Sequence, residues 1–137
     1  MPASSSSSCF FDTNVLLYLA SANEVKARRV EELLQDGGIV SVQVLNEIAN
    51  LLRRKMRTPW EKVTPFLQQF PLILTVVPVT LQVHETGLRL AKRYGLSVYD
   101  GMIVSAALAA DCNTLFSEDM HNGLVVDECL TIRNPFG

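Results

Sequence analysis

Short apolar segments alternate with longer amphipathic segments along the whole chain, and this pattern restricts the possible folds most strongly. The candidate strands are residues 9–12, 39–42, 72–77, 114–117 and 130–133. They are largely apolar on both faces, as is typical of parallel strands that helices cover on both sides. The alternation therefore predicts an α/β protein with three layers, α/β/α, around a mostly parallel, five-stranded sheet.

Helical spacing of apolar residues fills the intervals between the first four strands. The expected helices are residues 14–20, 23–35, 44–57, 59–70, 83–94 and 97–110. Asn23 and Ser97 are suitable N-caps, and Gly95 is well placed to end a helix. Each of the first three strands is thus followed by at least one helix, which is typical of parallel strands.

The length and composition fit one domain. The chain has 137 residues, of which 48% are apolar, and this supports one core without a disulfide or metal staple. We expect the Ser-rich residues 1–8 to be a disordered tail and residues 9–137 to form a single domain. No apolar segment approaches the ~20 residues of a membrane helix. The N-terminus lacks a signal-peptide pattern, so the sequence indicates a cytoplasmic protein with no membrane contact.

Charge and cysteine content narrow the function further. The formal net charge is −2, so nonspecific attraction of polyanions is excluded, and any nucleic-acid contact must use a local patch. The three cysteines include no CxxC pair and indicate neither a disulfide framework nor a zinc site.

Four acidic residues are expected at one edge of the sheet. Asp12 ends the first strand, Glu47 lies early in the helix after the second, Asp100 opens a helix, and Asp119 follows the fourth strand. Ligands of open parallel sheets bind beyond the carboxyl ends of the strands. Four crowded carboxylates cannot all stay ionised, so either some are protonated or a cation lies among them. Oxygen-only ligands suit Mg²⁺ or Mn²⁺, which can promote phosphodiester hydrolysis.

Other interpretations of these acids remain open. Asp12 alone could be a turn residue, and Asp100 alone could be a favourable charge in the first turn of a helix. A non-catalytic phosphoacceptor or partner-binding α/β domain would also place an Asp at a strand end. A phosphoacceptor domain of the receiver type has a Lys after a late strand. At that place this chain has only Arg133, followed by the residues NPF (134–136). Nucleotide-binding motifs of the GxxxxGK[ST] and GxGxxG types are absent from the sequence.

Five segments resemble a known family in order and spacing. They are FFDTNVLLY (10–18), SVQVLNEI (41–48), YDGMIVSAAL (99–108), LFSEDMHNG (115–123) and LTIRNPF (130–136). Together they are similar to the PIN domain and, more narrowly, to VapC-like toxin ribonucleases of bacterial type II toxin–antitoxin systems. The resemblance implies a PIN-like domain that cleaves RNA as a metal-dependent endoribonuclease. It also implies a homodimer and inhibition by a cognate antitoxin protein.

The resemblance also implies roles for particular residues. The acids that would bind Mg²⁺ or Mn²⁺ and act in catalysis are Asp12, Glu47, Asp100 and Asp119. Asn14 and Ser117 would orient carboxylates or water, although turn capping explains them equally well. Gly101 departs from the family pattern, which commonly has Ala there.

A basic stretch follows Glu47 on the same predicted helix. Arg53 and Arg54 lie near the helix end, where they could hold the RNA backbone that the carboxylates repel. Cations at a helix C-terminus are also favourable without any ligand, so both interpretations remain open.

Overall fold

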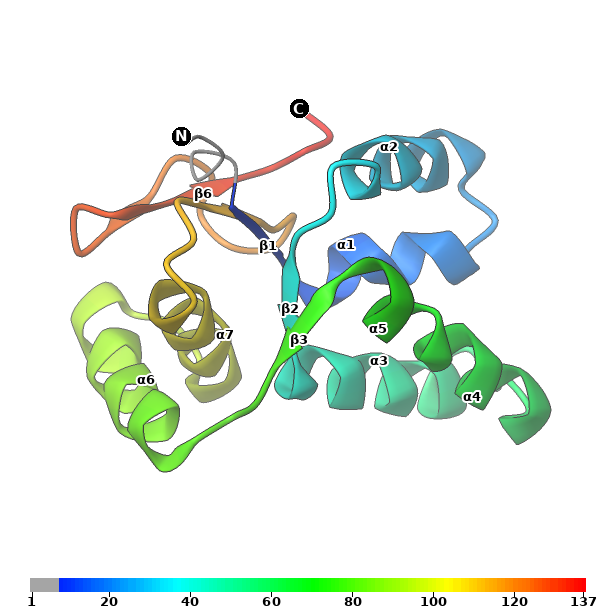
Figure 1. Ribbon diagram of the computed structural model, residues 1–137, viewed down its shortest axis with the longest axis horizontal. Coiled ribbons are helices and arrows are strands. Elements are labelled where there is room, and N and C mark those ends of the chain that lie inside the picture. Colours follow the sequence, from blue (N-terminus) through cyan, green and yellow to red (C-terminus); the bar gives the residue numbers. More distant parts are fainter. Residues whose placement is uncertain (1–7) are drawn as a thin grey trace.

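The computed structural model describes residues 8–137 (Figure 1). The strands are β1 (Cys9–Phe11), β2 (Ile39–Ser41), β3 (Thr75–Val77), β4 (Thr114–Phe116), β5 (Val125–Val126) and β6 (Leu130–Arg133). The helices are α1 (Thr13–Leu17), α2 (Glu24–Leu34), α3 (Val42–Arg54), α4 (Trp60–Gln68), α5 (Phe70–Ile73), α6 (Leu81–Tyr94) and α7 (Val98–Ala109), and the 3₁₀ turn η2 (Tyr18–Ala20) follows α1. Nearly all of the expected tail, residues 1–8, lies outside the described residues.

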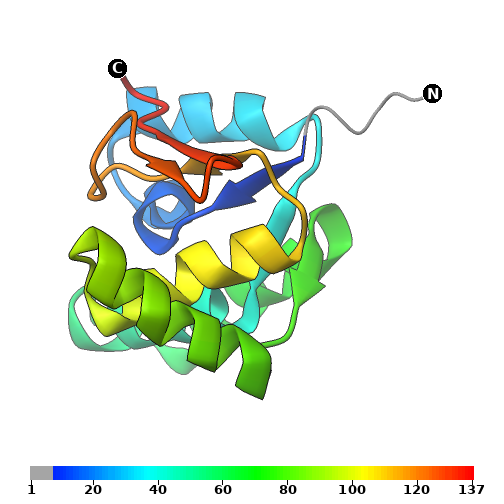
Figure 2. The same ribbon diagram turned by 90° about the vertical axis from the view of Figure 1, so that its left-hand side faces the viewer.

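The strands form one sheet in the order β3-β2-β1-β4-β6-β5. All neighbouring strands are parallel except β5 and β6. Helices α6 and α7 lie on one side of β1 to β3, and α1 to α5 lie on the other (Figure 1). When the molecule is turned by 90°, α6 and α7 stand in front of the sheet (Figure 2). The three-layer α/β/α architecture with a mostly parallel sheet is confirmed.

The predicted number of five strands is wrong, because the described residues form a six-stranded sheet. The additional strand, β5, is only two residues long and pairs antiparallel with β6. Asp127 and Glu128 form the turn between them, with φ values of 48° and 59°. The Cys129 N–H closes this turn by donating to the Val126 carbonyl at 3.0 Å. Two residues are too few to show the alternation that identifies a strand in a sequence.

The boundaries around the third strand also differ from the prediction. The expected helix over residues 59–70 ends at Gln68, and α5 occupies part of the expected strand over residues 72–77. Pro71 lies in the first turn of α5, where a missing N–H costs nothing, whereas inside a continuous helix it would remove a hydrogen bond. Leu72 is consequently 85% exposed instead of buried in the sheet.

The core explains why β1 is apolar throughout. Phe10 and Phe11 are both fully buried, although successive strand residues point to opposite faces of a sheet. Both faces of β1 are therefore covered. Within residues 8–137, no helix is sufficiently long and apolar to cross a bilayer.

Helices α6 and α7 approach each other closely at two glycines. A Cβ atom added to Gly101 would lie 2.5 Å from the carbonyl oxygen of Gly87, closer than such atoms can approach. A side chain at position 101 would therefore force the helices apart. Gly at position 101, where the family commonly has Ala, thus permits a close helix contact beside Asp100. Ser97 caps the same end of α7, as expected.

Candidate active site

Asp12 lies at the junction of two adjacent parallel strands. It follows β1 and caps α1, and Ser117 follows the neighbouring strand β4. The Asp12 side chain is buried, and its Oδ1 accepts a hydrogen bond from the Thr13 N–H at 2.7 Å. Its Oδ2 accepts a hydrogen bond from Ser117 Oγ, also at 2.7 Å. The carboxylate is therefore held on both oxygens.

Thr13 connects Asp12 to Glu47. The Thr13 hydroxyl donates to Glu47 Oε1 at 2.8 Å, while its backbone N–H donates to Asp12. Gln43, one helical turn before Glu47 on α3, donates from Nε2 to Glu47 Oε2 at 2.7 Å. Glu47 is therefore fixed in orientation by one residue from α1 and one from its own helix.

Asp100 and Asp119 complete the predicted set. Asp100 is half-buried in the first turn of α7, where its N–H donates to Ser97 Oγ at 3.1 Å. Asp119 is exposed after β4 and accepts a hydrogen bond from Asn14 Nδ2 of α1. The hydrogen bond between Asn14 and Asp119 joins the turn after β4 to α1.

The carboxylates influence one another electrostatically. Burial raises the pKa of Asp12 to about 6, hydrogen bonds from Ser117 and Thr13 oppose this shift, and the charges of Asp100 and Glu47 reinforce it. Burial likewise raises the pKa of Asp100, with Ser97 opposing and the charges of Glu47 and Asp119 reinforcing the shift. The fold thus brings the four acids close enough to disfavour their common ionisation.

The donor chemistry suits a hard divalent ion. Every candidate ligand is a carboxylate oxygen, which Mg²⁺ and Mn²⁺ favour. Among residues 8–137, however, no three acidic, His or Cys side chains are grouped so that they alone could hold an ion. Mg²⁺ commonly keeps several waters and takes only one or two protein carboxylates. The acids therefore fit a hydrated ion better than a closed cage of protein ligands.

Sequence reasoning missed two residues of this arrangement, Thr13 and Gln43. The spacing of four between Gln43 and Glu47 was a usable signal, because such residues are neighbours on a helix surface. The contact between Thr13 and Glu47 spans 34 positions and has no local signal. Asn14 and Ser117 do contact acidic partners, Asp119 and Asp12, while their roles in a reaction remain predictions.

The two arginines predicted to contact RNA have different surroundings. The Arg53 guanidinium lies over the Trp60 ring, 4.6 Å from its centroid, and Nη1 donates to the Thr58 carbonyl at 2.9 Å. Arg54 lines a shallow surface pocket together with Asn50. Arg53 thus already stabilises the junction after α3, and the predicted RNA contact stays a prediction for both.

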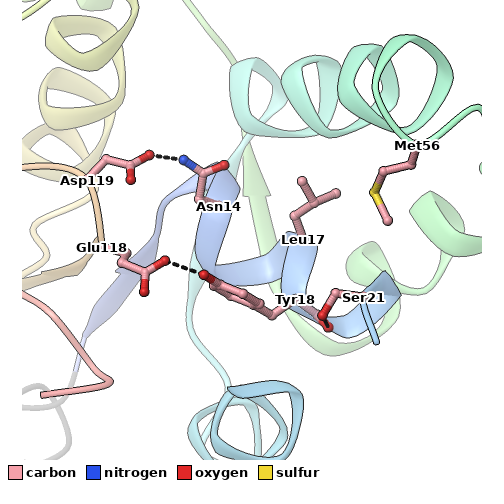
Figure 3. Close-up of a pocket in the computed structure, with 7 residues that line it drawn as sticks. All are labelled: Asn14, Leu17, Tyr18, Ser21, Met56, Glu118 and Asp119. Carbon is pink, nitrogen blue, oxygen red and sulfur yellow. Dashed lines mark hydrogen bonds between the residues drawn. The ribbon is translucent and has the colours of Figure 1, made fainter. Parts of the chain in front are cut away.

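A pocket of about 260 Å³ adjoins Asp119. It is lined by Asn14, Leu17, Tyr18, Ser21, Met56, Glu118 and Asp119. Glu118 and Asp119 reach from the segment after β4 toward Tyr18 and Asn14, and Leu17 and Met56 lie beyond them (Figure 3). The pocket therefore joins an acidic wall to an apolar one.

Glu118 differs from its neighbour Asp119 because it has a cationic partner. Lys26 of α2 forms a salt bridge with Glu118, and the Tyr18 hydroxyl donates a hydrogen bond to the same carboxylate. Burial acts to raise the pKa of Glu118, but hydrogen bonds from Lys26 and Tyr18 outweigh it and lower the pKa. Glu118 is therefore held both in position and in its ionised form.

The family model of the PIN domain matches residues 9–121. This match covers most of the chain, so the chain belongs to the PIN domain family. This match confirms the resemblance to the PIN domain that the sequence motifs indicated. No curated protein matches the chain.

Solved structures share this fold at low sequence identity. A toxin–antitoxin complex from Klebsiella pneumoniae has a TM-score of 0.71 and 16% identity, covering 93% of this chain and 98% of that one. DNA-bound VapBC from Salmonella typhimurium has a TM-score of 0.70 and 16% identity, covering 94% and 98%. The sarcin–ricin loop cleaving toxin VapC20 from Mycobacterium tuberculosis has a TM-score of 0.67 and 18% identity, covering 82% and 90%. At these identities, the likeness establishes the fold alone.

Proposed function

We propose that this chain is a Mg²⁺- or Mn²⁺-dependent endoribonuclease and the toxin of a toxin–antitoxin pair. The observation that carries the proposal is the convergence of Asp12, Glu47 and Asp100 in a chain of the PIN family. Asp12 caps α1, Glu47 lies in the second turn of α3, and Asp100 lies in the first turn of α7. Burial raises the pKa of Asp12, and the charges of Asp100 and Glu47 raise it further. A purely structural role would not require mutually unfavourable charges.

The residues of the chain have distinct roles in this proposal. A bound divalent ion would supply the positive charge that activates water and offsets charge on the phosphate. Asp12, Glu47, Asp100 and Asp119 would hold that ion, directly or through water. Hydrogen bonds from Ser117 and Thr13 keep the Asp12 carboxylate fixed, and the hydrogen bond from Asn14 orients Asp119. Such partners of ligand groups tune metal affinity.

RNA must also be held against the repulsion of the acids. Arg53 and Arg54 extend from the end of α3, the helix that carries Glu47. In the proposal they contact RNA phosphates. Arg54 would contribute more, because Arg53 is engaged by Trp60 and Thr58.

The proposed partners follow from similar structures. The matched structures include a toxin–antitoxin complex and a DNA-bound VapBC. By analogy, we propose that a cognate antitoxin inhibits this chain, that the chain forms a homodimer, and that it acts on RNA in the cytoplasm.

Cleavage of total RNA tests the proposal directly. Wild type, Asp12→Asn and the exposed-site control Asp36→Asn would be incubated with RNA, with and without Mn²⁺, and new 5′ ends would be mapped. Specific new ends should arise with wild type and Asp36→Asn in Mn²⁺ only. Cleavage that is equal for Asp12→Asn, or no cleavage by wild type in Mn²⁺, would contradict the proposal.

A further inference from the structure

A groove at the junction of α3 and α4 adjoins the pocket beside Asp119. This cationic groove has a volume of about 430 Å³, and its lining includes Ala20, Met56, Arg57, Pro59, Lys62 and Phe66. Met56 also lines the pocket beside Asp119, where it lies beyond Leu17 as seen from the acid (Figure 3). The two cavities therefore meet at Met56 and lead from Asp119 toward α4.

Arg57 and Lys62 supply the positive charge of the cationic groove. Arg57 follows the end of α3, and Lys62 lies in the first turn of α4. Both side chains are exposed, and within residues 8–137 neither takes part in a salt bridge. Their charges are thus available to a ligand in the groove.

Basic residues are concentrated at this junction. Residues 53–62 contain five of the chain's 12 basic residues and one of its 14 acids, Glu61. Because the net charge of the chain is −2, a polyanion can be attracted only by such a local patch. Proteins commonly hold single-stranded nucleic acid in a groove that combines cations for the phosphates with apolar and aromatic surface for the bases. Met56, Pro59 and Phe66 provide that surface here.

The position of the cationic groove favours RNA over an acidic protein segment. Charge alone would suit either ligand. However, an RNA strand extends on both sides of the bond that is cut, so it needs a path that leads away from the acids. The pocket that Asp119 shares with Met56 provides this path, and Glu118 in its wall is already paired with Lys26.

We propose that Arg57 and Lys62 bind phosphates of an RNA strand that runs from the acids past Met56 into the cationic groove. The inference deepens the proposed ribonuclease function and rests on it. It adds two RNA contacts to Arg53 and Arg54, and it places them on the side of the α3–α4 junction that faces the pocket beside Asp119.

Binding of labelled oligouridine in EDTA tests this inference separately from cleavage. Fluorescence anisotropy at several salt concentrations would compare wild type with the double variant Arg57→Gly/Lys62→Ala. Each lost phosphate contact should reduce the log–log salt slope by about 0.7, so the double variant should lose about 1.4 and bind at least about tenfold more weakly in low salt. Arg28→Ala/Lys92→Ala is the matched control, because both residues are exposed and line neither cavity.

The substitutions are chosen to preserve the fold. Arg57 has a φ of 53°, in the left-handed region that favours glycine, and alanine is the most favourable residue in a helix such as α4. The melting temperature of the double variant should therefore not fall. Lys62→Ala alone should lose about half of the slope change, and Arg57→Lys, which keeps the charge, should retain the wild-type slope.

Each outcome has a defined meaning. An unchanged salt slope in the folded double variant, or no binding by wild type, overturns the inference. A polyglutamate peptide that binds wild type as tightly as the RNA, and loses affinity in the double variant, would overturn it in favour of an acidic protein partner. RNA that stays uncut in Mn²⁺ although the double variant binds it more weakly would contradict the ribonuclease function and leave the RNA contacts supported.

Discussion

This protein holds two neighbouring groups of side chains with opposite charge balance. The unbalanced group consists of Asp12, Glu47, Asp100 and Asp119, and the balanced group consists of Glu118 with Lys26 and Tyr18. Within residues 8–137, none of the acids Asp12, Glu47, Asp100 and Asp119 takes part in a salt bridge. Glu118, directly before Asp119 in the chain, is paired with Lys26. The pKa of Asp12 is raised to about 6 by burial and like charges, whereas the pKa of Glu118 is lowered.

Ionised Glu118 is stabilised by partners within the protein, whereas the ionised carboxylates of the unbalanced group are not. Glu118 has its counter-charge within the protein, so its ionised form already stabilises the fold. Asp12 and its neighbours are destabilised when ionised, and an external cation would relieve this repulsion. The unbalanced group is therefore the better candidate for metal binding.

The largest expected effect is the loss of cleavage in Asp100→Asn. Removing one charge from the unbalanced group should lower the rate of RNA cleavage at least about a hundredfold, because metal sites depend strongly on each surrounding group. The fold should be retained, since the variant also removes repulsion with Glu47. Activity is measured on a defined RNA with Asp36→Asn as control. Cleavage near the wild-type rate would remove Asp100 from the mechanism.

The pH dependence of stability should reveal Asp12. Its pKa is about 3.8 in the unfolded chain and about 6 in the fold, so the stability it contributes is present below pH 4 and is lost as the pH rises to 6. This loss is about 3 kcal/mol. Without metal, Asp12→Asn should remove this part of the profile and be more stable than wild type at pH 7. Urea unfolding from pH 4 to 7 measures the free energy of unfolding of both proteins. If the two free energies changed in parallel with pH, the raised pKa of Asp12 would be contradicted.

Tyr18→Phe should lower the stability of the protein at pH 7, whereas Asp12→Asn should raise it. The variant removes one hydrogen bond to ionised Glu118 and should destabilise the protein by about 1 kcal/mol at pH 7. Since the pKa of Glu118 is lowered in the fold, this contribution should disappear as the pH falls through that pKa. The effect should be the same with and without Mn²⁺. A destabilisation that appears only with Mn²⁺ would place Tyr18 in the metal site instead.

The smallest expected effect concerns the arginines outside both groups. Each phosphate contact that is lost should reduce the salt dependence of RNA binding by about 0.7 in the log–log slope. Arg54→Ala should show this reduction more fully than Arg53→Ala, because Arg53 is held by Trp60. Binding of single-stranded RNA at several salt concentrations checks this. An unchanged slope in the double variant would assign both arginines to helix-end stabilisation alone.

The fold was largely predictable because its main signals are local. Strand β1 is apolar at every position, and the caps Asn23 and Ser97 accept hydrogen bonds at the expected helix starts. Strand β5 was not predictable, since a two-residue strand is defined by its partner β6 and not by its own pattern. The helix break at Gln69 was not predicted, although Pro71 follows it closely, because the apolar residues from Leu72 onward favoured a strand.

The sequence singled out the four acids and two residues that contact them, Asn14 and Ser117, but not Thr13 and Gln43. The metal-binding role of the acids stays a prediction. Asp12 and Asp119 follow strands, Asp100 lies in the first turn of α7, and Glu47 lies in the second turn of α3. The topology then brings them to one edge of the sheet. The salt bridge of Lys26 and Glu118 spans 92 positions, so only the folded chain reveals it. For the same reason, the sequence could not separate the unbalanced carboxylates from the balanced Glu118.

Mn²⁺ titration followed by the melting temperature tests the central claim, that the unbalanced carboxylates need a cation. Ligand at a hundred times its dissociation constant stabilises a folded protein by about 2.7 kcal/mol. At pH 7, the melting temperature of wild type and of Asp36→Asn should rise with Mn²⁺ and saturate, while that of Asp12→Asn should rise much less. A wild-type melting temperature that is unchanged in millimolar Mn²⁺, or an equal rise in Asp12→Asn, would contradict the claim.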